Sequence, residues 1–286
     1  MKIILYTSFA LVAFAFNSIL CRLALGTEAI DAASFTLVRL VSGAITLVVI
    51  SSVFGKTGTK GGNWFSAFFL FGYAICFSFA YISLTTATGA LILFGCVQAT
   101  MIIVALLSGE RPKFLEWFGL LFALGGLVYL VFPGLTAPPI FSSLLMMSAG
   151  ISWAFYTLRG KGGTNPLADT TGNFVRAVPM IVAVCLPFLY QIQLSQQGIL
   201  LAVLSGAFAS GLGYLVWYAA LKFHTATRAA ILQLSVPALA AIGGVILLAE
   251  TVSFRLLSAT ALILGGIALA IVGRKNGKSK VKIKLM

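Results

Sequence analysis

Residues 225–274, near the end of the chain, consist of two long apolar runs separated by one short polar step at Glu250-Thr251. Each run is about 20 residues long, and at about 1.5 Å of rise per residue a helix of that length crosses the hydrocarbon core of a bilayer. The first run contains Pro237 and the glycine pair Gly243-Gly244, and the second contains the pair Gly265-Gly266. This stretch therefore predicts a helical hairpin inside a membrane.

The same pattern occurs once more, 140 positions earlier. There Glu250 corresponds to Glu110, and Gly265-Gly266 corresponds to Gly125-Gly126. An offset of 137 aligns the preceding segments and places Arg22 on Arg159. A helix–hinge–helix pattern that recurs without gaps indicates an internal repeat.

The amino-acid composition is typical of an integral membrane protein. Hydrophobic residues make up 60% of the sequence and charged residues 9%, whereas a soluble domain has about 25% charged residues. The mean hydropathy is +1.07. The apolar runs do not alternate as the strands of a membrane barrel do. The predicted class is an all-α integral membrane protein.

We expect ten transmembrane helices, arranged as two five-helix repeats at residues 1–133 and 140–273 and followed by a basic tail at 274–286. The predicted spans are 3–22, 33–54, 64–84, 88–108, 114–132, 140–158, 173–190, 198–221, 228–249 and 254–272. The connections are short and leave no room for a soluble domain.

The basic residues fix a predicted orientation. Of the 19 Lys and Arg residues, 15 fall on the side that also holds both termini, and only Arg22 and Arg255 fall on the other side. This bias predicts that both termini are cytoplasmic. The class of protein, and not the bias, favours the inner membrane of a bacterium. The net charge of +13 then reflects topology and not nucleic-acid binding, and the basic tail is expected to rest on anionic lipid headgroups of the bilayer.

An odd number of spans per repeat means that the second repeat is inserted upside down relative to the first. Glu110 is then expected at the cytoplasmic face and Glu250 at the outer face. Inverted repeats of this kind are an architecture of secondary transporters, which bind their solute near the midplane between the halves.

Three segments resemble the EamA modules of the drug/metabolite transporter superfamily. They read SWAFYTLRGK (152–161), SGLGYLVWYAALK (210–222) and AILQLSVPALAAIGGVILLAE (230–250), and in the last the proline Pro237 precedes Glu250 by thirteen residues, as in that family. The first module departs from the pattern, with Val97 in place of the proline and Phe16-Asn17 in place of a frequent Trp-Gly pair. The resemblance implies ten helices, inverted pseudo-symmetry, alternating access and, commonly, export of small metabolites.

Two arginines, Arg39 and Arg176, fall inside predicted spans, and the repeat pairs them. An intramembrane arginine is costly and is by default a functional candidate. The alternatives are that each side chain snorkels to the headgroups or binds a backbone carbonyl. A functional pair would place a cation at each end of the pathway, which favours solutes with a carboxylate or phosphate, such as amino acids.

Aromatic and amide side chains complete the predicted solute site, although any single aromatic could instead serve packing or the interface belt. Asn17, Gln98 and Gln233 are the stronger candidates, because an unpaired amide is costly in hydrocarbon. The aromatic members are Tyr73, Phe77, Tyr81, Trp153, Tyr156, Tyr214 and Trp217. Such a lining suits small amphiphilic or aromatic molecules, whereas Ser210 and the neighbouring glycines of the eighth span are assigned to close helix packing.

All six carboxylates lie at predicted helix ends or in loops. Proton relays in membranes usually need a carboxylate within a span, so we expect no coupling through a buried carboxylate, which favours uniport or exchange. Glu110 and Glu250 are expected to act as caps or hinges, or else to pair in a gate, and Pro237 is a candidate kink.

Nothing in the sequence indicates a catalytic site, a metal site or a cofactor. The four cysteines lie apart in apolar runs and form no C-x-x-C pair, so packing is their expected role. The expected partners are a small-molecule solute and the bilayer, in a monomer or homodimer. The functional alternatives to an exporter are a metabolite importer, a nucleotide-sugar-type exchanger and, more remotely, a membrane-embedded enzyme.

Overall fold

The computed structural model describes residues 2–54, 61–107, 114–132, 137–160, 163–187, 192–224, 232–233 and 235–275, and these residues form helices and no strand. In the first half the helices are α1 (Lys2–Gly26), α2 (Ala32–Phe54), α3 (Trp64–Ala80), α4 (Thr86–Leu107) and α5 (Phe114–Val131). In the second half they are α6 (Ile140–Gly160), α7 (Pro166–Cys185), α8 (Gln196–Val203), the π-helical segment η2 (Leu204–Leu212), α9 (Gly213–Leu221), α11 (Ser235–Leu248) and α12 (Phe254–Lys275). The prediction of an all-α membrane protein is confirmed.

Five of these helices are long and apolar enough to cross a bilayer: α1, α2, α4, α6 and the continuous helix of 26 residues that α8, η2 and α9 form together. Shorter apolar helices occur at Trp64–Ala80, Trp117–Leu130, Ser235–Leu248 and Phe254–Gly266. The arrangement as ten spans in two inverted repeats therefore stays a prediction.

The seventh predicted span, 173–190, was misplaced. The helix α7 begins at Pro166, seven residues earlier, and ends at Cys185. The side chain of Asn165 accepts a hydrogen bond from the backbone N of Ala168 (3.2 Å), and proline suits the first helical position because its missing N–H would have no helical partner there. A prediction from hydropathy alone misses the first residues of α7 because they are polar.

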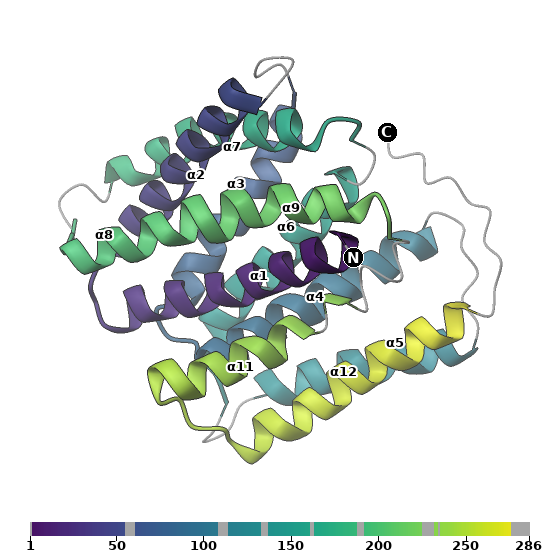
Figure 1. Cartoon of the computed structure of the whole chain (residues 1–286). Coiled ribbons are helices and arrows are strands. Elements are labelled where there is room, and N and C mark those ends of the chain that lie inside the picture. The colour runs from purple at the N-terminus through teal and green to yellow at the C-terminus, as the bar shows by residue number, and fades with distance from the viewer. Residues whose placement is uncertain are drawn as a thin grey trace.

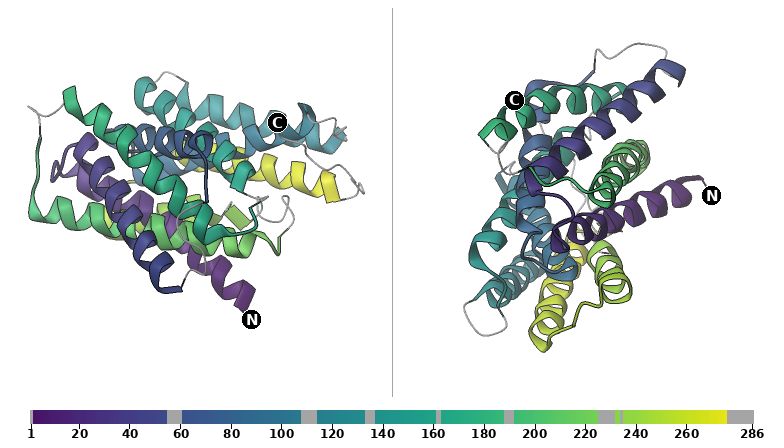
Figure 2. Two further views of the ribbon diagram at one scale, coloured as in Figure 1. Left: turned by 90° about the horizontal axis from the view of Figure 1, so that it is seen from above. Right: turned by 90° about the vertical axis from the view of Figure 1, so that its left-hand side faces the viewer.

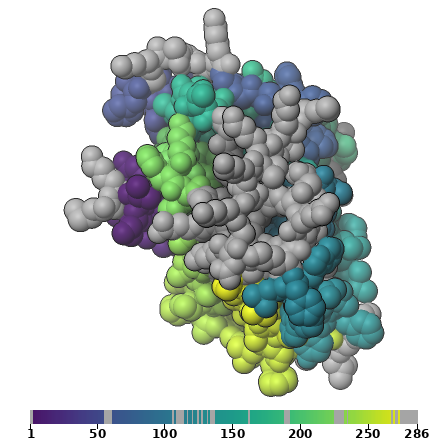
Figure 3. All heavy atoms as spheres, turned by 90° about the vertical axis from the view of Figure 1, so that its right-hand side faces the viewer, coloured from purple at the N-terminus to yellow at the C-terminus, as the bar shows by residue number. Residues whose placement is uncertain are grey.

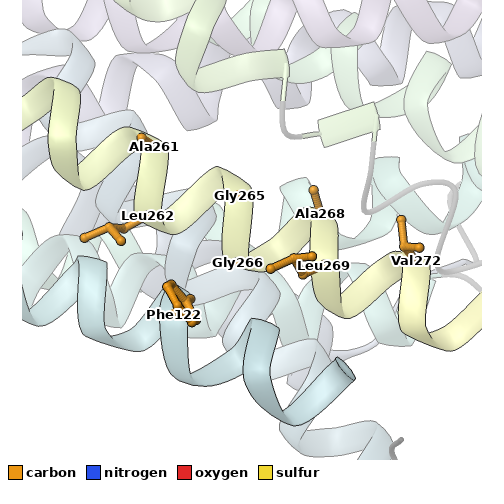
Figure 4. Close-up of a pocket in the computed structure, with 8 residues that line it drawn as sticks. All are labelled: Phe122, Ala261, Leu262, Gly265, Gly266, Ala268, Leu269 and Val272. Carbon is orange, nitrogen blue, oxygen red and sulfur yellow. The ribbon is translucent and has the colours of Figure 1, made fainter. Parts of the chain in front are cut away.

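The helices form a bundle with one pair set at its edge. Helices α5 and α12 lie side by side along most of their length, at the lower right in the view of Figure 1. Figure 3 shows the same pair, in blue-teal and yellow, at one end of the molecule beside α11. An open apolar groove on this pair is lined by Phe122 of α5 and by residues of α12 between Ala261 and Val272 (Figure 4).

Glycines set the close approach within this pair. A Cβ on Gly266 would lie 2.5 Å from the backbone N of Ala123, and a Cβ on Gly126 would lie 2.7 Å from the Cβ of Leu262. The neighbouring Gly125 and Gly265 face open space. One glycine of each pair therefore allows helix contact, as expected for small residues in membrane helices.

The centre of the bundle is built from both halves of the chain. Helix α3 packs against α6 and α7, α2 packs against α7 and η2, and α1 packs against η2, α9 and α11. Figure 2 shows these helices crossing one another in two further views. The largest fully buried side chains of the described residues include Trp217, Arg39, Tyr81, Tyr156 and Tyr214. An arginine thus lies in the core of an apolar bundle.

Candidate functional site

Arg39 of α2 is the centre of the candidate site, and its side chain is 1% exposed. Its Nε donates a hydrogen bond to the Oγ of Ser210 in η2 (3.0 Å). Its Nη2 donates to the hydroxyls of Tyr73 in α3 (3.1 Å) and Tyr214 in α9 (2.9 Å). One guanidinium therefore joins four helical elements drawn from both halves of the chain.

A second layer of hydrogen bonds extends this centre to α1. The amide Nδ2 of Asn17 donates to the hydroxyl of Tyr73 (3.1 Å), and the Oγ of Ser205 in η2 donates to the Oδ1 of Asn17 (2.6 Å). Both side chains are buried, so this layer satisfies polar groups that would otherwise be costly in an apolar interior. We name the set Asn17, Arg39, Tyr73, Ser205, Ser210 and Tyr214 the Arg39 cluster.

Aromatic rings enclose the Arg39 cluster. The guanidinium carbon of Arg39 lies 5.0 Å from the ring centre of Phe77 and 5.1 Å from that of Tyr73, within the range of cation–π attraction. The ring of Trp153 in α6 lies 4.7 Å from that of Tyr214 and 5.0 Å from that of Tyr73. The cluster therefore has one cationic head and a wall of aromatic faces.

The local geometry of η2 explains how its serines reach this centre. Gly206 approaches α2 so closely that an added Cβ would collide with the backbone O of Arg39, and Gly43 of α2 has the Gly206 carbonyl O 3.0 Å from the place of its missing Cβ. The π-helical turns of η2 place both Ser205 and Ser210 on buried positions. Interruptions of this kind in α-helices are frequent at functional sites.

The charge of Arg39 has no acidic partner among the described residues. Its three polar partners are neutral hydroxyls, and its Nη1 is buried without a hydrogen-bond partner in the described part of the chain. A buried charge without a counter-ion is costly. The aromatic faces and hydroxyls offset only part of that cost, so the site is suited to receive a negative group.

Polar contacts close the bundle at the end where α3 meets α4, which we name the Glu250 end. Both carboxylate oxygens of Glu250 accept from the backbone N of Thr86 (2.7 and 2.9 Å), and Oε1 also accepts from the Thr86 hydroxyl (2.9 Å). Arg22 lies 3.8 Å from the same carboxylate and donates to the carbonyls of Tyr81 and Ile82 (3.1 and 2.9 Å). Four helices, α1, α3, α4 and α11, meet in this contact.

A different polar set joins the helices at the opposite end, which we name the Asn63 end. Arg159 donates to the Oγ of Ser66 (3.2 Å), although the repeat pairs it with Arg22. The carboxylate of Asp169 and the side-chain oxygen of Asn173 accept from the backbone N–H groups of Gly62 and Asn63 (3.0 Å each). The two ends are therefore closed by unlike contacts.

The two arginines that the sequence places within predicted spans have different environments. Arg176 is partly exposed, and its Nη1 donates to the carbonyls of Gly61 (2.9 Å) and Gly172 (2.8 Å) at the Asn63 end. Of the alternatives left open by the sequence, the carbonyl contact therefore describes Arg176. Arg39 instead binds hydroxyls in the core.

The other predicted site residues are distributed between the cluster and its surroundings. Tyr81 packs on Phe77 with ring centres 4.8 Å apart and reaches the Glu250 end, while Trp217 packs on Phe14 at 5.6 Å. Tyr156 packs on Trp153 at 5.7 Å. Gln98 of α4 and Gln233, which precedes α11, are both buried. Pro237 is buried in the first described turn of α11, and Glu110 lies outside the described residues.

Sequence reasoning missed several residues that the structure places in contacts. Ser205 was not singled out, and Ser210 was assigned to packing alone. Arg22 and Thr86 were not expected to contact Glu250. A single hydroxyl on a small-residue helix face carries no distinct pattern, so only the position of the facing helix reveals its partner.

Comparisons with known proteins relate this chain to a family of transporters. The EamA-like transporter family model matches residues 140–272. An uncharacterized protein of Pseudomonas aeruginosa is 49% identical over 274 residues, which is 96% of each chain. An uncharacterized transporter of Archaeoglobus fulgidus is 30% identical over 179 residues, which is 60% of this chain and 62% of that protein. One solved crystal structure has 19% sequence identity to this chain, and the alignment covers 96% of this chain and 99% of the other, with a TM-score of 0.66. The two proteins therefore share a fold.

Proposed function

Because the chain belongs to the EamA-like transporter family, we propose that it is a secondary transporter that exports small organic solutes, such as amino acids or related metabolites and amphiphiles. It works by alternating access across the inner membrane of a bacterium, with both termini in the cytoplasm. The Arg39 cluster is the part of the solute pathway that recognises the solute. The observation that carries this proposal is a buried polar centre shared by both halves of an otherwise apolar bundle.

Helix packing supports the inverted repeat on which alternating access depends. If a two-fold axis relates the halves, α1 corresponds to α6, α2 to α7, α3 to the helix of α8, η2 and α9, α4 to α11, and α5 to α12. Because α3 packs on α6, the symmetry requires that α9 and η2 pack on α1. Because α4 packs on α6, it also requires that α11 pack on α1. All of these contacts occur, as do the self-related contacts α2–α7, α4–α11 and α5–α12.

The polar contacts at the two ends support a mechanism of alternate opening. At the Glu250 end and at the Asn63 end, side chains join helices of opposite halves. Release of one set with retention of the other would expose the Arg39 cluster to one side of the membrane at a time. The glycines along α5 and α12 permit close but weakly locked helix contacts that can slide or rock.

The proposal is tested by reconstituting the purified protein in liposomes. Efflux and counterflow would be measured with a panel of radiolabelled amino acids, aromatic carboxylates, nucleotides and aromatic amines, with protein-free liposomes as the reference. The expected result is saturable movement of at least one class that depends on protein and is competed by its unlabelled form. Correctly folded protein that moves no member of the panel would count against transport.

A further inference from the structure

We infer that the Arg39 cluster binds an organic monoanion, through a carboxylate placed at Arg39 and an aromatic or apolar body placed against Trp153 and Tyr214. This inference rests on the proposed transport function and names the class of its solute. It also implies that cations are rejected and that a zwitterion gains nothing from its ammonium group.

The first argument is charge. Arg39 carries a permanent positive charge and is 1% exposed, and its polar partners are hydroxyls. Among the described residues, an ion pair joins Arg22 to Glu250 at the Glu250 end of the bundle and does not involve Arg39. A bound monoanion would supply the missing counter-charge in a medium of low dielectric, where such a pair is strongest. A cation would meet an uncompensated like charge there.

The second argument is the kind of hydrogen-bonding group left without a partner. In the described core these groups include Arg39 Nη1, Trp153 Nε1 and Trp217 Nε1, together with the hydroxyls of Tyr156 and Thr157 and both amide atoms of Gln233. The first three can only donate, because a guanidinium and an indole have N–H groups and no acceptor, and a hydroxyl can donate as well as accept. A surplus of buried donors calls for a ligand that brings acceptor oxygens, and a carboxylate brings two.

The third argument is that the cluster can adapt to such a ligand. The hydroxyls of Tyr73, Tyr214 and Ser210 accept hydrogen bonds from Arg39. A hydroxyl can also donate, so each of them can turn its proton toward a carboxylate oxygen once the guanidinium binds the anion. The hydroxyls thus hold the guanidinium in the ligand-free state and become additional donors in the loaded state.

The fourth argument concerns the body of the ligand. Trp153 lies 4.7 Å from Tyr214 and 5.0 Å from Tyr73, and Phe14 packs on Trp153 at 5.5 Å. These rings stand beside the same hydroxyls that hold Arg39. An aromatic or apolar group attached to the carboxylate would replace ring–ring contacts with contacts of the same kind, so the aromatic wall selects for such a body.

A set of ligands that differ only in the head group tests the inference on the unaltered purified protein. The probes are 3-phenylpropionate, its uncharged isostere 3-phenylpropionamide, and the cation 3-phenylpropylamine, and binding is followed by tryptophan fluorescence and thermal shift. We expect saturable binding of the carboxylate, at least tenfold weaker binding of the amide, and no saturable binding of the amine. Equal affinity for the acid and the amide, or no binding of the acid, would overturn the inference.

Matched variants locate the site. Arg39→Gln is expected to weaken binding of 3-phenylpropionate at least tenfold. The affinity of Arg39→Lys should lie between those of Arg39→Gln and the unaltered protein, because lysine keeps the charge but lacks the planar guanidinium. Arg255→Gln is the control, since Arg255 lies on α12 against the ring of Tyr129, away from the cluster. Unchanged affinity in a folded Arg39→Gln protein would refute the assignment. If that variant does not fold, Ser210→Ala is used instead, because it keeps the charge of Arg39. It must still weaken the binding of 3-phenylpropionate more than the binding of 3-phenylpropionamide.

The failure of this inference and the failure of the proposed function give different results. Liposomes that transport the amine or the amide, with no preference for the acid, would leave a transporter whose solute is not an anion. Binding of the acid to Arg39 without movement of any labelled solute would leave an anion site in a protein that does not transport.

Discussion

The carboxylate of Glu250 caps the first turn of α4 by accepting hydrogen bonds from both the backbone N and the hydroxyl of Thr86. The first N–H groups of a helix have no partner within the helix, and a carboxylate there also meets the favourable end of the helix dipole. Glu250 follows Ala249, which has a positive φ of 53°. The end of α11 is thus turned so that its carboxylate reaches a helix of the other half.

Replacement of this carboxylate is expected to destabilise the fold. Glu250→Gln puts an amide where the N-terminus of α4 needs acceptors, and the loss should be about 1–2 kcal/mol, as for other helix caps. The measurement is thermal or denaturant unfolding of the purified protein. Glu28→Gln is the control, because Glu28 is an exposed carboxylate at the same end of the bundle. Equal stability of the two variants would contradict the capping role.

The two glycines of one pair on α12 should respond differently to the same substitution. Gly266→Ala places a methyl group 2.5 Å from the backbone N of Ala123 and 2.6 Å from the carbonyl O of Gly119, so α5 and α12 must separate at a cost of about 1–3 kcal/mol. Gly265→Ala meets nothing within 4 Å and should leave stability unchanged or slightly raised. Unfolding of both variants is compared, and similar losses would mean that α5 and α12 do not pack in this register.

The proposed orientation can be checked with single cysteines and a membrane-impermeant maleimide on right-side-out spheroplasts. Thr27→Cys lies in the exposed loop after α1, and Lys222→Cys lies at the exposed end of α9 on the opposite side of the bundle. We expect labelling of the first in intact spheroplasts and of the second only after permeabilisation. The native Cys21, Cys96 and Cys185 are buried, and Cys76→Ser removes the half-buried thiol. The reverse pattern would place the termini outside.

A carboxylate built into the Arg39 cluster should compete with the inferred anion. Asn17→Asp keeps the shape of the side chain and sets a negative charge beside the hydroxyl of Tyr73, which in turn binds Arg39. The Kd for 3-phenylpropionate should rise at least tenfold because Arg39 then has an internal counter-charge. Asn173→Asp makes the same change at the Asn63 end, where the oxygen still accepts from the backbone N of Asn63, and should leave binding unchanged. Equal effects of the two substitutions would argue against a role of charge at the cluster.

Most of the fold could be predicted from the sequence, because burial in lipid imposes the same local requirement on every apolar run. Each apolar run of about 20 residues must satisfy its own backbone hydrogen bonds and so becomes a helix. The predicted spans accordingly coincide with observed helices to within a few residues at most positions. One exception was α7, whose start at Pro166 is marked by turn chemistry and not by hydropathy. The predicted start of the ninth span, at residue 228, lies outside the described residues.

The site was accessible only in part. Asn17, Tyr73, Trp153 and Tyr214 were expected from their residue types, and the structure brings them to Arg39 or its aromatic wall. The serines of η2 were not expected to be partners, because their hydrogen bonds depend on the close approach of η2 to α2 at Gly206. Glu250 was expected at a helix end, but the helix that it caps begins 164 positions away in the chain.

The sequence by itself determined that this chain forms membrane helices, where most of them begin and end, and that two arginines fall within them. Only the tertiary structure decided that these arginines differ, with Arg176 bound to backbone carbonyls at the bundle end and Arg39 held in the core. The free-energy cost of moving a backbone polar group or a charged side chain out of water depends on each position by itself, so it can be read along the sequence. The partner that offsets this cost for Arg39 lies 171 positions away, and only the packing of one helix against another brings it within reach.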